Sequence, residues 1–395
     1  MTQTTIREIR GDEMLDIMYG LDAYAFGSSP PLPDRAKWEN VIRQREDVTY
    51  FALFEHDNAV ATVAGAPMTQ NVRGALFGMS GLWGVMTHPA ARRKGYSRRT
   101  LARLLASIRE DGRPLSCLYP FRESFYERLG YVTFPLPRTA KLAPSALLPL
   151  LKEDLGGEIE LTLIGDGYDV YRDYLGKLRQ RVHGMALFDP SQKASAQQRN
   201  NLWLAQARVG GELVGLMLYD LKGEHATKFK LRAVRFYYDT SQGRRLLLEW
   251  MARHADQANE VEIWLPPLEL PETWLADIQV STESATRAPM GRVVDVANIG
   301  GMHTGPGRFA ARISDALCLW NEGLWQFETL DGVLHVSQAD EADCELSICA
   351  LAALIYGTHA PNDFAVRGWG NPSLEVQQTM RAMFPPMLPH LHEYF

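Results

Sequence analysis

One basic stretch early in the chain combines the residue types that bind a polyanion. Residues 92–98 read Arg-Arg-Lys-Gly-Tyr-Ser-Arg, an apolar run at residues 82–86 precedes them, and an apolar stripe of helical spacing at residues 101–108 follows. A strand that enters a helix through such a loop brings together free backbone N–H groups, the positive end of a helix dipole and fixed cations. The stretch therefore predicts an anion site, most simply for a pyrophosphate.

The spacing within this stretch narrows the class of site. A Walker loop needs Gly-x-x-x-x-Gly-Lys-Ser/Thr and a Rossmann loop needs Gly-x-Gly-x-x-Gly, and neither is present. The chain instead carries Arg92-x-x-Gly95-x-Ser97 directly after the apolar run. This resembles the pyrophosphate signature of the GNAT acetyltransferases, Arg/Gln-x-x-Gly-x-Gly/Ala, with Ser97 departing at the last position. A solvated helix start with surface arginines is the alternative interpretation of so short a motif.

A second signature lies downstream of the first. The apolar run at residues 115–119 is followed by residues 125–131, which read Phe-Tyr-Glu-Arg-Leu-Gly-Tyr. They resemble the Phe-Tyr-x-x-x-Gly-Tyr/Phe helix of GNAT enzymes. In that family the strand ahead of this helix splays from its neighbour to admit the pantetheine arm of coenzyme A. Two signatures in the family's order predict a GNAT fold for the first part of the chain.

Composition and charge limit the partners. A chain of 395 residues is long enough for about two or three domains. Its formal net charge of −6 argues against broad binding to nucleic acid or anionic membranes, because both need an excess of cations. We therefore expect neither a nucleic-acid nor a membrane partner.

Compartment and metal content follow from charges, cysteines and histidines. Charged residues at positions 7, 10, 12 and 13 interrupt any signal-peptide core, so we expect a cytoplasmic protein. The four cysteines have no Cys-x-x-Cys spacing, and the ten histidines are scattered. We expect buried reduced thiols and no metal site.

The order of elements predicts a repeated architecture. A hairpin at residues 50–54 and 60–68 precedes the basic loop. The middle third repeats this order, with a hairpin at 202–207 and 213–219, a strand at 231–238, a helix at 246–254 and a strand at 261–265. The loop of this second copy, residues 238–244, carries an acid where cations would be needed. We therefore expect no pyrophosphate site in the second copy.

The last third changes character. It has a hairpin at 327–330 and 333–336, a strand at 344–348 and helices at 351–356 and 374–383, which resemble a sterol-carrier-like domain. The predicted fold class is α+β, with tandem GNAT domains followed by an SCP2-like α/β domain. The predicted ranges are 1–154 for the first GNAT domain, 155–290 for the second and 291–395 for the sterol-carrier-like domain.

This order of domains, with a terminal Phe395, resembles the enhanced-intracellular-survival (Eis) family of N-acetyltransferases. The resemblance covers the whole chain in domain order and is specific at residues 85–98, at residues 121–131 and at the C-terminus. It implies acetyl-CoA as the cofactor, direct attack by a primary amine in a ternary complex, and a homohexamer. The implied acceptors are aminoglycosides, polyamines or lysine side chains.

The resemblance and the motifs assign site residues. Cofactor binding falls to Val85, Met86, Thr87, Arg92, Arg93, Lys94, Gly95, Tyr96, Ser97, Arg98, Phe121 and Arg122. The family implies that Tyr126 donates a proton to the leaving thiolate and that the Phe395 carboxylate accepts one from the amine. For the acceptor pocket we expect the aromatic residues Tyr24, Phe26, Trp38 and Trp83 together with Glu393. The first three of these aromatics are equally open to a core role.

Transfer of an acyl group from a thioester to an amine needs an acid, a base and a hydrogen-bond donor, whatever the family. An amine attacks a thioester only when it is neutral, and a thiolate leaves better when it is protonated. The carbonyl oxygen needs a donor, for which the Val85 N–H is suited. A chain-terminal carboxylate has an ordinary pKa of about 3.5, low for a base unless burial raises it. Tyr126 is therefore better suited to its role than Phe395.

Two other functions stay open from the sequence. A tandem-GNAT aminoacyl transferase would take its acyl group from aminoacyl-tRNA, but it would need a cationic groove for the tRNA. A non-catalytic lipid or coenzyme A carrier would rest on the last domain alone. For a cationic antibiotic as acceptor, the first loop supplies the acid Asp22 and the tail supplies Glu393, with Tyr394 and not an acid beside the terminus.

Overall fold

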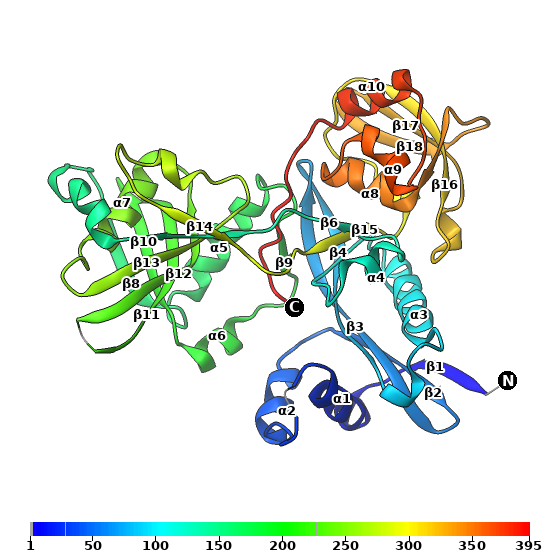
Figure 1. The fold of residues 1–395 in the computed structure, drawn as a ribbon, viewed down its shortest axis with the longest axis horizontal. Helices are drawn as coiled ribbons and strands as arrows, with labels where there is room; N and C mark the ends of the chain where they lie inside the picture. The colour runs from blue at the N-terminus through cyan, green and yellow to red at the C-terminus, as the bar shows by residue number, and fades with distance from the viewer. Residues whose placement is uncertain (1–2, 28, 226) are drawn as a thin grey trace. The chain divides into compact units, whose positions relative to one another are not determined.

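The computed structural model describes residues 3–27, 29–225 and 227–395, which divide into two compact units (Figure 1). The first unit comprises the described residues of Met1–Pro135, Arg179–Pro190 and Arg287–Phe395. The second comprises those of Leu136–Leu178 and Ser191–Thr286.

The first unit is built on an eight-stranded sheet among its described residues. Its strands are β1 (Thr4–Glu8), β2 (Thr49–Glu55), β3 (Asn58–Val72), β4 (Ala75–Thr87), β5 (Leu115–Leu118), β6 (Val132–Thr133), β9 (Ala186–Phe188) and β15 (Met290–Val293). The order is β1-β2-β3-β4-β5-β15-β6, and β9 pairs with β3. The predicted hairpin of β2 and β3 is confirmed.

The pairing of β4 with β5 is short. These parallel strands are in register only from Met79 opposite Leu115 to Leu82 opposite Leu118. Beyond that pair β4 runs on to Thr87 without β5 beside it. The sheet therefore opens where the predicted site begins.

Four helices accompany this sheet in the described residues. They are α1 (Gly11–Ala25), α2 (Arg35–Arg43), α3 (Tyr96–Glu110) and α4 (Glu123–Glu127). The predicted stripe of α3 is confirmed, because Leu101, Leu104, Leu105 and Ile108 are all buried. They pack in one cluster with Leu82 of β4 and Leu118 of β5. This packing fixes α3 on the sheet beside the opening.

The last third of the chain packs on the same sheet. It forms a four-stranded sheet in the order β18-β17-β16-β19, and the predicted hairpin is confirmed. The elements are β16 (Arg308–Ser314), β17 (Gly323–Leu330), β18 (Val333–Gln338), β19 (Cys344–Ser347), α8 (Ile348–Tyr356), α9 (Phe364–Arg367) and α10 (Leu374–Met383). Every residue of α8 is buried, in a core that it shares with β3, β4 and β5.

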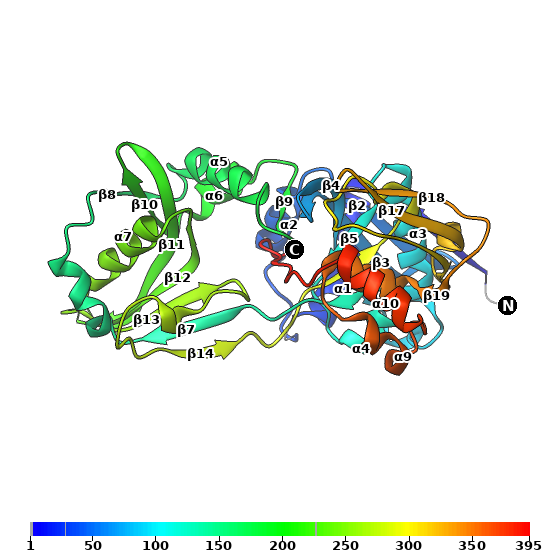
Figure 2. The same ribbon diagram turned by 90° about the horizontal axis from the view of Figure 1, so that it is seen from above.

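The second unit repeats the architecture of the first sheet, as the sequence predicts. Its strands and helices can be followed in Figure 2. Its elements are β7 (Arg138–Leu142), β8 (Glu158–Leu163), α5 (Tyr168–Arg179), α6 (Lys193–Arg199), β10 (Trp203–Val209), β11 (Glu212–His225), β12 (Lys228–Tyr238), α7 (Ser241–Ala252), β13 (Ala258–Leu265) and β14 (Ser281–Ser284). The sheet order is β14-β7-β13-β12-β11-β10-β8. Strands β12 and β13 form the parallel pair, and α7 connects them.

Two elements sit elsewhere than their sequence neighbours suggest. Strand β15, expected to begin the last third, lies between β5 and β6 in the first sheet. Strand β7 falls inside the range predicted for the first GNAT domain, yet it pairs with β13 and β14 in the second unit. Each sheet thus contains a strand from outside the range predicted for it. The domain boundaries at residues 154 and 290 stay a prediction.

Two further features of the fold concern the cysteine thiols and the lengths of the helices. All four cysteines are free, and burial raises the pKa of Cys117 and Cys349 to about 12. These thiols are therefore inert at neutral pH. Among the described residues, no helix is both long and apolar enough to cross a bilayer.

A buried histidine in the first unit makes stability depend on pH. The Arg73 N–H donates to Nδ1 of His183 at 3.0 Å, so the ring proton lies on Nε2, which donates to the Tyr356 carbonyl at 3.0 Å. Burial lowers the pKa of His183 to about 4. The ring is thus neutral in the fold across the range in which an unfolded histidine, with a pKa of about 6.5, takes up a proton.

We predict that this histidine costs stability as the pH falls from about 6.5 to about 4, by about 3 kcal/mol in total. Below pH 4 the loss levels off, since both states then bind the proton. Urea unfolding of the wild type and His183→Gln at pH 7.0 and 4.5 measures this. The wild type should lose more free energy of unfolding than the variant, and equal losses would contradict the assignment.

Candidate active site

The wall of the site is a bulged stretch of β4. Thr62 of β3 pairs with Met86 and Ala64 pairs with Trp83, so Val63 alone faces both residues 84 and 85. Gly84 has a φ of +59°, as the bulge requires. A bulge leaves one residue out of the ladder and turns the strand. The bulge therefore takes residues 84 and 85 out of the regular ladder, and β4 pairs with β3 again at Met86 and Thr87.

The basic loop and the first turn of α3 form the floor. Arg93 and Gly95 have φ values of +64° and +77°, and Gly95 is the N-cap residue of α3. Within the described residues, no side chain caps this helix. Its first N–H groups therefore stay available, beside backbone in the left-handed conformation that forms anion-binding nests.

The matching helix of the second unit differs. The Thr240 hydroxyl accepts a hydrogen bond from the Gly243 N–H of α7 at 3.0 Å. The loop ahead of that helix carries Asp239 and no cluster of cations. The start of α7 is thus capped by its own side chain, and its cations, Arg244 and Arg245, come only after that cap. The absence of a pyrophosphate site from the second copy stays a prediction.

A cavity of about 740 Å³ lies over this wall and floor. It is lined by Ala25, Phe26, Val85, Met86, Thr87, Ala91, Arg92, Arg93, Gly95, Tyr96, Ser97, Arg98, Phe121, Phe125 and Arg128. The structure thus brings together ten of the twelve residues predicted to bind the cofactor; Lys94 and Arg122 are not in this lining. Phe125 and Arg128 are lining residues that the sequence reasoning did not single out.

The cations around the cavity are engaged to different degrees. Lys94 forms an exposed ion pair with Glu55 at 2.9 Å, and the Tyr96 hydroxyl also donates to Glu55. These hydrogen bonds lower the pKa of Glu55. Arg98 donates to the Ala316 carbonyl at 2.8 Å, whereas Arg93 makes no ion pair within the described residues. Lys94 therefore points to the outer side of the loop.

Ser97, which departs from the family signature, uses its hydroxyl to contact the end of β4. Its hydroxyl lies 2.7 Å from the Thr87 hydroxyl. Arg92 Nε donates to the Thr87 carbonyl at 3.3 Å. A glycine or alanine at position 97 could not make the first of these bonds. The serine therefore ties the end of β4 to the start of α3.

Tyr126 lies directly behind the aromatic edge of the cavity. Its ring contacts Phe125 and Phe121, with centroids 5.0 Å and 5.9 Å away. The residue is 4% exposed, and burial raises the pKa of its phenol. Within the described residues the hydroxyl has no hydrogen-bond partner. The phenol therefore keeps its proton at neutral pH and can donate it.

The predicted acceptor residues divide into two groups. Trp38 Nε1 donates to Asp22 at 2.9 Å, and burial raises the pKa of that carboxyl. Trp83 packs in the same cluster, with the Arg45 guanidinium 4.0 Å from its ring. These two tryptophans are partly buried against that cluster, and neither is in the lining of the cavity.

Two further aromatics extend from the end of α1. Tyr24 and Phe26 are each 60% exposed. Phe26 lines the cavity, and the Arg92 guanidinium lies 5.6 Å from the Tyr24 ring. Solvent-exposed aromatic rings at a cavity mouth can contact an incoming molecule.

The C-terminal residues lie against the same sheet. The Tyr119 hydroxyl donates to the Glu393 carbonyl at 3.1 Å, and its ring stacks on Tyr394 at 4.7 Å. The Phe395 ring packs so close to Gly81 of β4 that a Cβ there would come within 3.0 Å of it. Neither Phe395 nor Glu393 is in the cavity lining. The tail thus reaches β4 ahead of the bulge.

Comparison with known proteins identifies two domains. The profile of the acetyltransferase (GNAT) domain matches residues 5–134, and that of the sterol carrier protein domain matches residues 302–392. No curated protein sequence matches the chain.

Several solved structures share the fold. They include a protein of unknown function and probable N-acyltransferase from Enterococcus faecalis V583 (18% identity, TM-score 0.84), a GCN5-related N-acetyltransferase from Kribbella flavida (19%, 0.82) and Eis1 from Mycobacterium abscessus (16%, 0.77). In each case 100% of both chains is covered. The chain therefore has the fold of GNAT N-acyltransferases over its whole length, with an acetyltransferase (GNAT) domain near its start and a sterol carrier protein domain near its end.

Proposed function

We propose that the protein transfers an acetyl group from acetyl-CoA to a primary amine by direct attack in a ternary complex. One observation carries this proposal. The uncapped, cationic start of α3 and the bulged end of β4 line the same cavity as Phe121 and Phe125, against which Tyr126 packs. An anion site, a strand wall and a buried proton donor thus converge.

The residues present fit the donor. A pyrophosphate needs backbone N–H groups and positive charge, which the first turn of α3 and Arg93 supply. The extended pantetheine arm can lie along residues 85–87 as an added strand does. Acetyl-CoA supplies an acetyl thioester when it is bound. Phe121 and Arg122 are proposed to contact its outer edge.

Two proton transfers fall to this chain. Tyr126 donates a proton to the departing thiolate, because its buried phenol is protonated and adjoins the cavity. The Val85 N–H donates to the carbonyl oxygen as negative charge develops there. We propose the Phe395 carboxylate as the acceptor of the amine proton.

The acceptor is proposed as an aminoglycoside, a polyamine or a lysine side chain. Tyr24, Phe26, Trp38 and Trp83 form its apolar contacts in this proposal, and Glu393 attracts its positive charge. By the resemblance to the Eis family, we further propose a cytoplasmic homohexamer. Sedimentation velocity would separate a hexamer from a monomer of 44.4 kDa.

We predict one coenzyme A site per chain and a specific effect of Gly95→Ala. The substitution strains the left-handed backbone and displaces N–H groups that bind charge. Each such hydrogen bond is worth about 1.5–3 kcal/mol, so affinity should fall at least about tenfold. Calorimetry measures both stoichiometry and affinity.

Gly112→Ala is the matched control. Gly112 follows the other end of α3, has a φ of +73° and, like Gly95, has no atom within 4 Å of an added Cβ. Both substitutions should cost about 1 kcal/mol of stability. Equal affinities in the two variants, or two sites per chain, would show that the start of α3 is not the binding site.

We predict that Tyr126→Phe lowers kcat about 100-fold while the affinity for acetyl-CoA changes little. The hydroxyl acts on charge that exists mainly in the transition state. Steady-state rates as a function of pH, together with calorimetry, make the measurement. Wild-type turnover with an unchanged pH profile would remove Tyr126 as the acid.

We predict that two glycines added after Phe395 lower kcat about tenfold or more, because they keep every side chain but move the carboxylate. Deletion of Phe395 should have an effect at least as large. If the extended protein acetylates a good amine as fast as the native one with unchanged assembly, the amine proton leaves by another route.

A further inference from the structure

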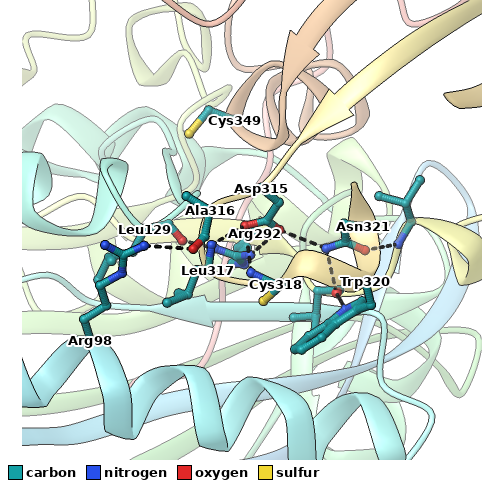
Figure 3. A network of polar contacts seen from close by, with 12 residues as sticks. Arg98, Leu129, Arg292, Asp315, Ala316, Leu317, Cys318, Trp320, Asn321 and Cys349 are labelled. Carbon is teal, nitrogen blue, oxygen red and sulfur yellow. Dashed lines mark hydrogen bonds and ion pairs between the residues drawn. The ribbon is translucent and has the colours of Figure 1, made fainter. Parts of the chain in front are cut away.

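A buried ion pair lies beside the turn that ends α4. Arg292 of β15 is fully buried, and its Nη2 lies 2.5 Å from Asp315 Oδ2 (Figure 3). Its other terminal nitrogen, Nη1, donates to the Leu129 carbonyl. Leu129 belongs to the turn that closes α4. The guanidinium thus joins α4 to the loop after β16.

Asp315 fixes that loop. Its Oδ1 accepts the N–H groups of Leu317 and Cys318 at 3.1 Å each. Its Oδ2 also accepts from Asn321, which is itself fully buried, at 2.9 Å. The Ala316 carbonyl, held in place by these bonds, accepts the hydrogen bond from Arg98 in the first turn of α3 (Figure 3).

The hydrogen bonds from Arg292 through Leu129 end at Tyr126. Its carbonyl accepts the N–H groups of Leu129 at 2.9 Å and of Tyr131 at 3.1 Å. Gly130, between them, has a φ of +90°, and a Cβ there would collide with Arg292. The turn that ends α4 is therefore shaped around the guanidinium.

The segment that follows β15 also holds the C-terminal end of α3. Arg109 Nε lies 3.0 Å from Asp295, and Asp295 is 5% exposed. Helix α3 is thus attached near both ends to residues 292–316. A buried ion pair contributes little net stability compared with apolar residues, and its best attested benefit is a fixed arrangement. The stability of the fold alone therefore does not account for the buried pair of Arg292 and Asp315.

We propose that Arg292 and Asp315 are positioning residues, which set α4 with Tyr126 at a fixed place relative to the first turn of α3. The inference rests on the proposed function, in which α3 holds the acetyl donor and Tyr126 protonates its thiolate. The last third of the chain thereby acts on catalysis without touching the substrate. Breaking the pair should misplace the phenol and leave the anion site intact.

The test uses Arg292→Met combined with Asp315→Leu, which removes both buried charges and leaves neither unpaired. This double variant should bind coenzyme A with nearly native affinity. Its kcat should fall by about 100-fold, the size expected for a misplaced group. In a Tyr126→Phe background the same pair of substitutions should change kcat by only about twofold, because the group that it positions is already gone.

Two comparisons decide the result. Phe309→Leu, in the core of the same domain, lowers stability without touching α3 or α4 and should keep kcat. If the losses from the double variant and Tyr126→Phe multiply as independent effects do, or if the double variant keeps its kcat, the proposal is wrong. Where the double variant fails to fold, Asp315→Asn replaces it in the same cycle and the same outcomes apply.

Hydrogen exchange supplies a readout that needs no activity. In the double variant the amides of residues 123–131 should exchange faster than in the wild type and in Phe309→Leu. Unchanged exchange there would overturn the positioning role. If the wild type releases no thiol with any amine, the proposed function has failed, and this exchange measurement alone decides whether the pair positions α4.

Discussion

Among the residues that the structure describes, no side chain caps the first N–H groups of α3, and the rest of the site is arranged around them. A helix start carries orphan donors that must find a partner. Here Gly95 supplies the left-handed turn and no capping side chain, so the donors remain for a ligand. The bulge at Gly84 and the short pairing of β4 with β5 open the sheet beside them. The candidate anion site and an open sheet edge thus adjoin.

The second unit shows what happens when that constraint is removed. It keeps a parallel strand pair joined by a helix, but Thr240 caps the helix and Asp239 replaces the cations. In the core of this unit the Phe236 ring packs on Trp274, with ring centroids 5.6 Å apart. The same architecture therefore persists as a packed, apolar layer when a side chain of the helix's own N-terminus accepts the hydrogen bond of its first N–H groups.

Elements with local periodicity were predictable from the sequence. The stripe of α3, the hairpin of β10 and β11 about Gly210 and Gly211, and that of β17 and β18 all follow from short-range patterns. The grouping of the basic loop with Phe121 was also predictable, because two motifs in order imply one fold. The boundaries between the sheets were harder to predict from the sequence, because the residues of a strand do not specify which strand it pairs with.

The unpredicted parts depend on contacts between distant segments. Strand β15 enters the first sheet far from its neighbours in sequence, and nothing local indicates this. Arg292 and Asp315 look like ordinary surface charges until the fold buries both. Arg128 occupies a variable position of its motif, so only the cavity reveals it.

The central claim is that an amine attacks the bound acetyl thioester directly. The most direct measurement is thiol release from acetyl-CoA with a panel of polyamines, aminoglycosides and lysine peptides, with mass analysis of protein and product. The account predicts release only when an amine is present, an acceptor heavier by one acetyl group, and an unmodified protein. Release without amine, an acetylated protein intermediate, or no release with any amine would contradict it.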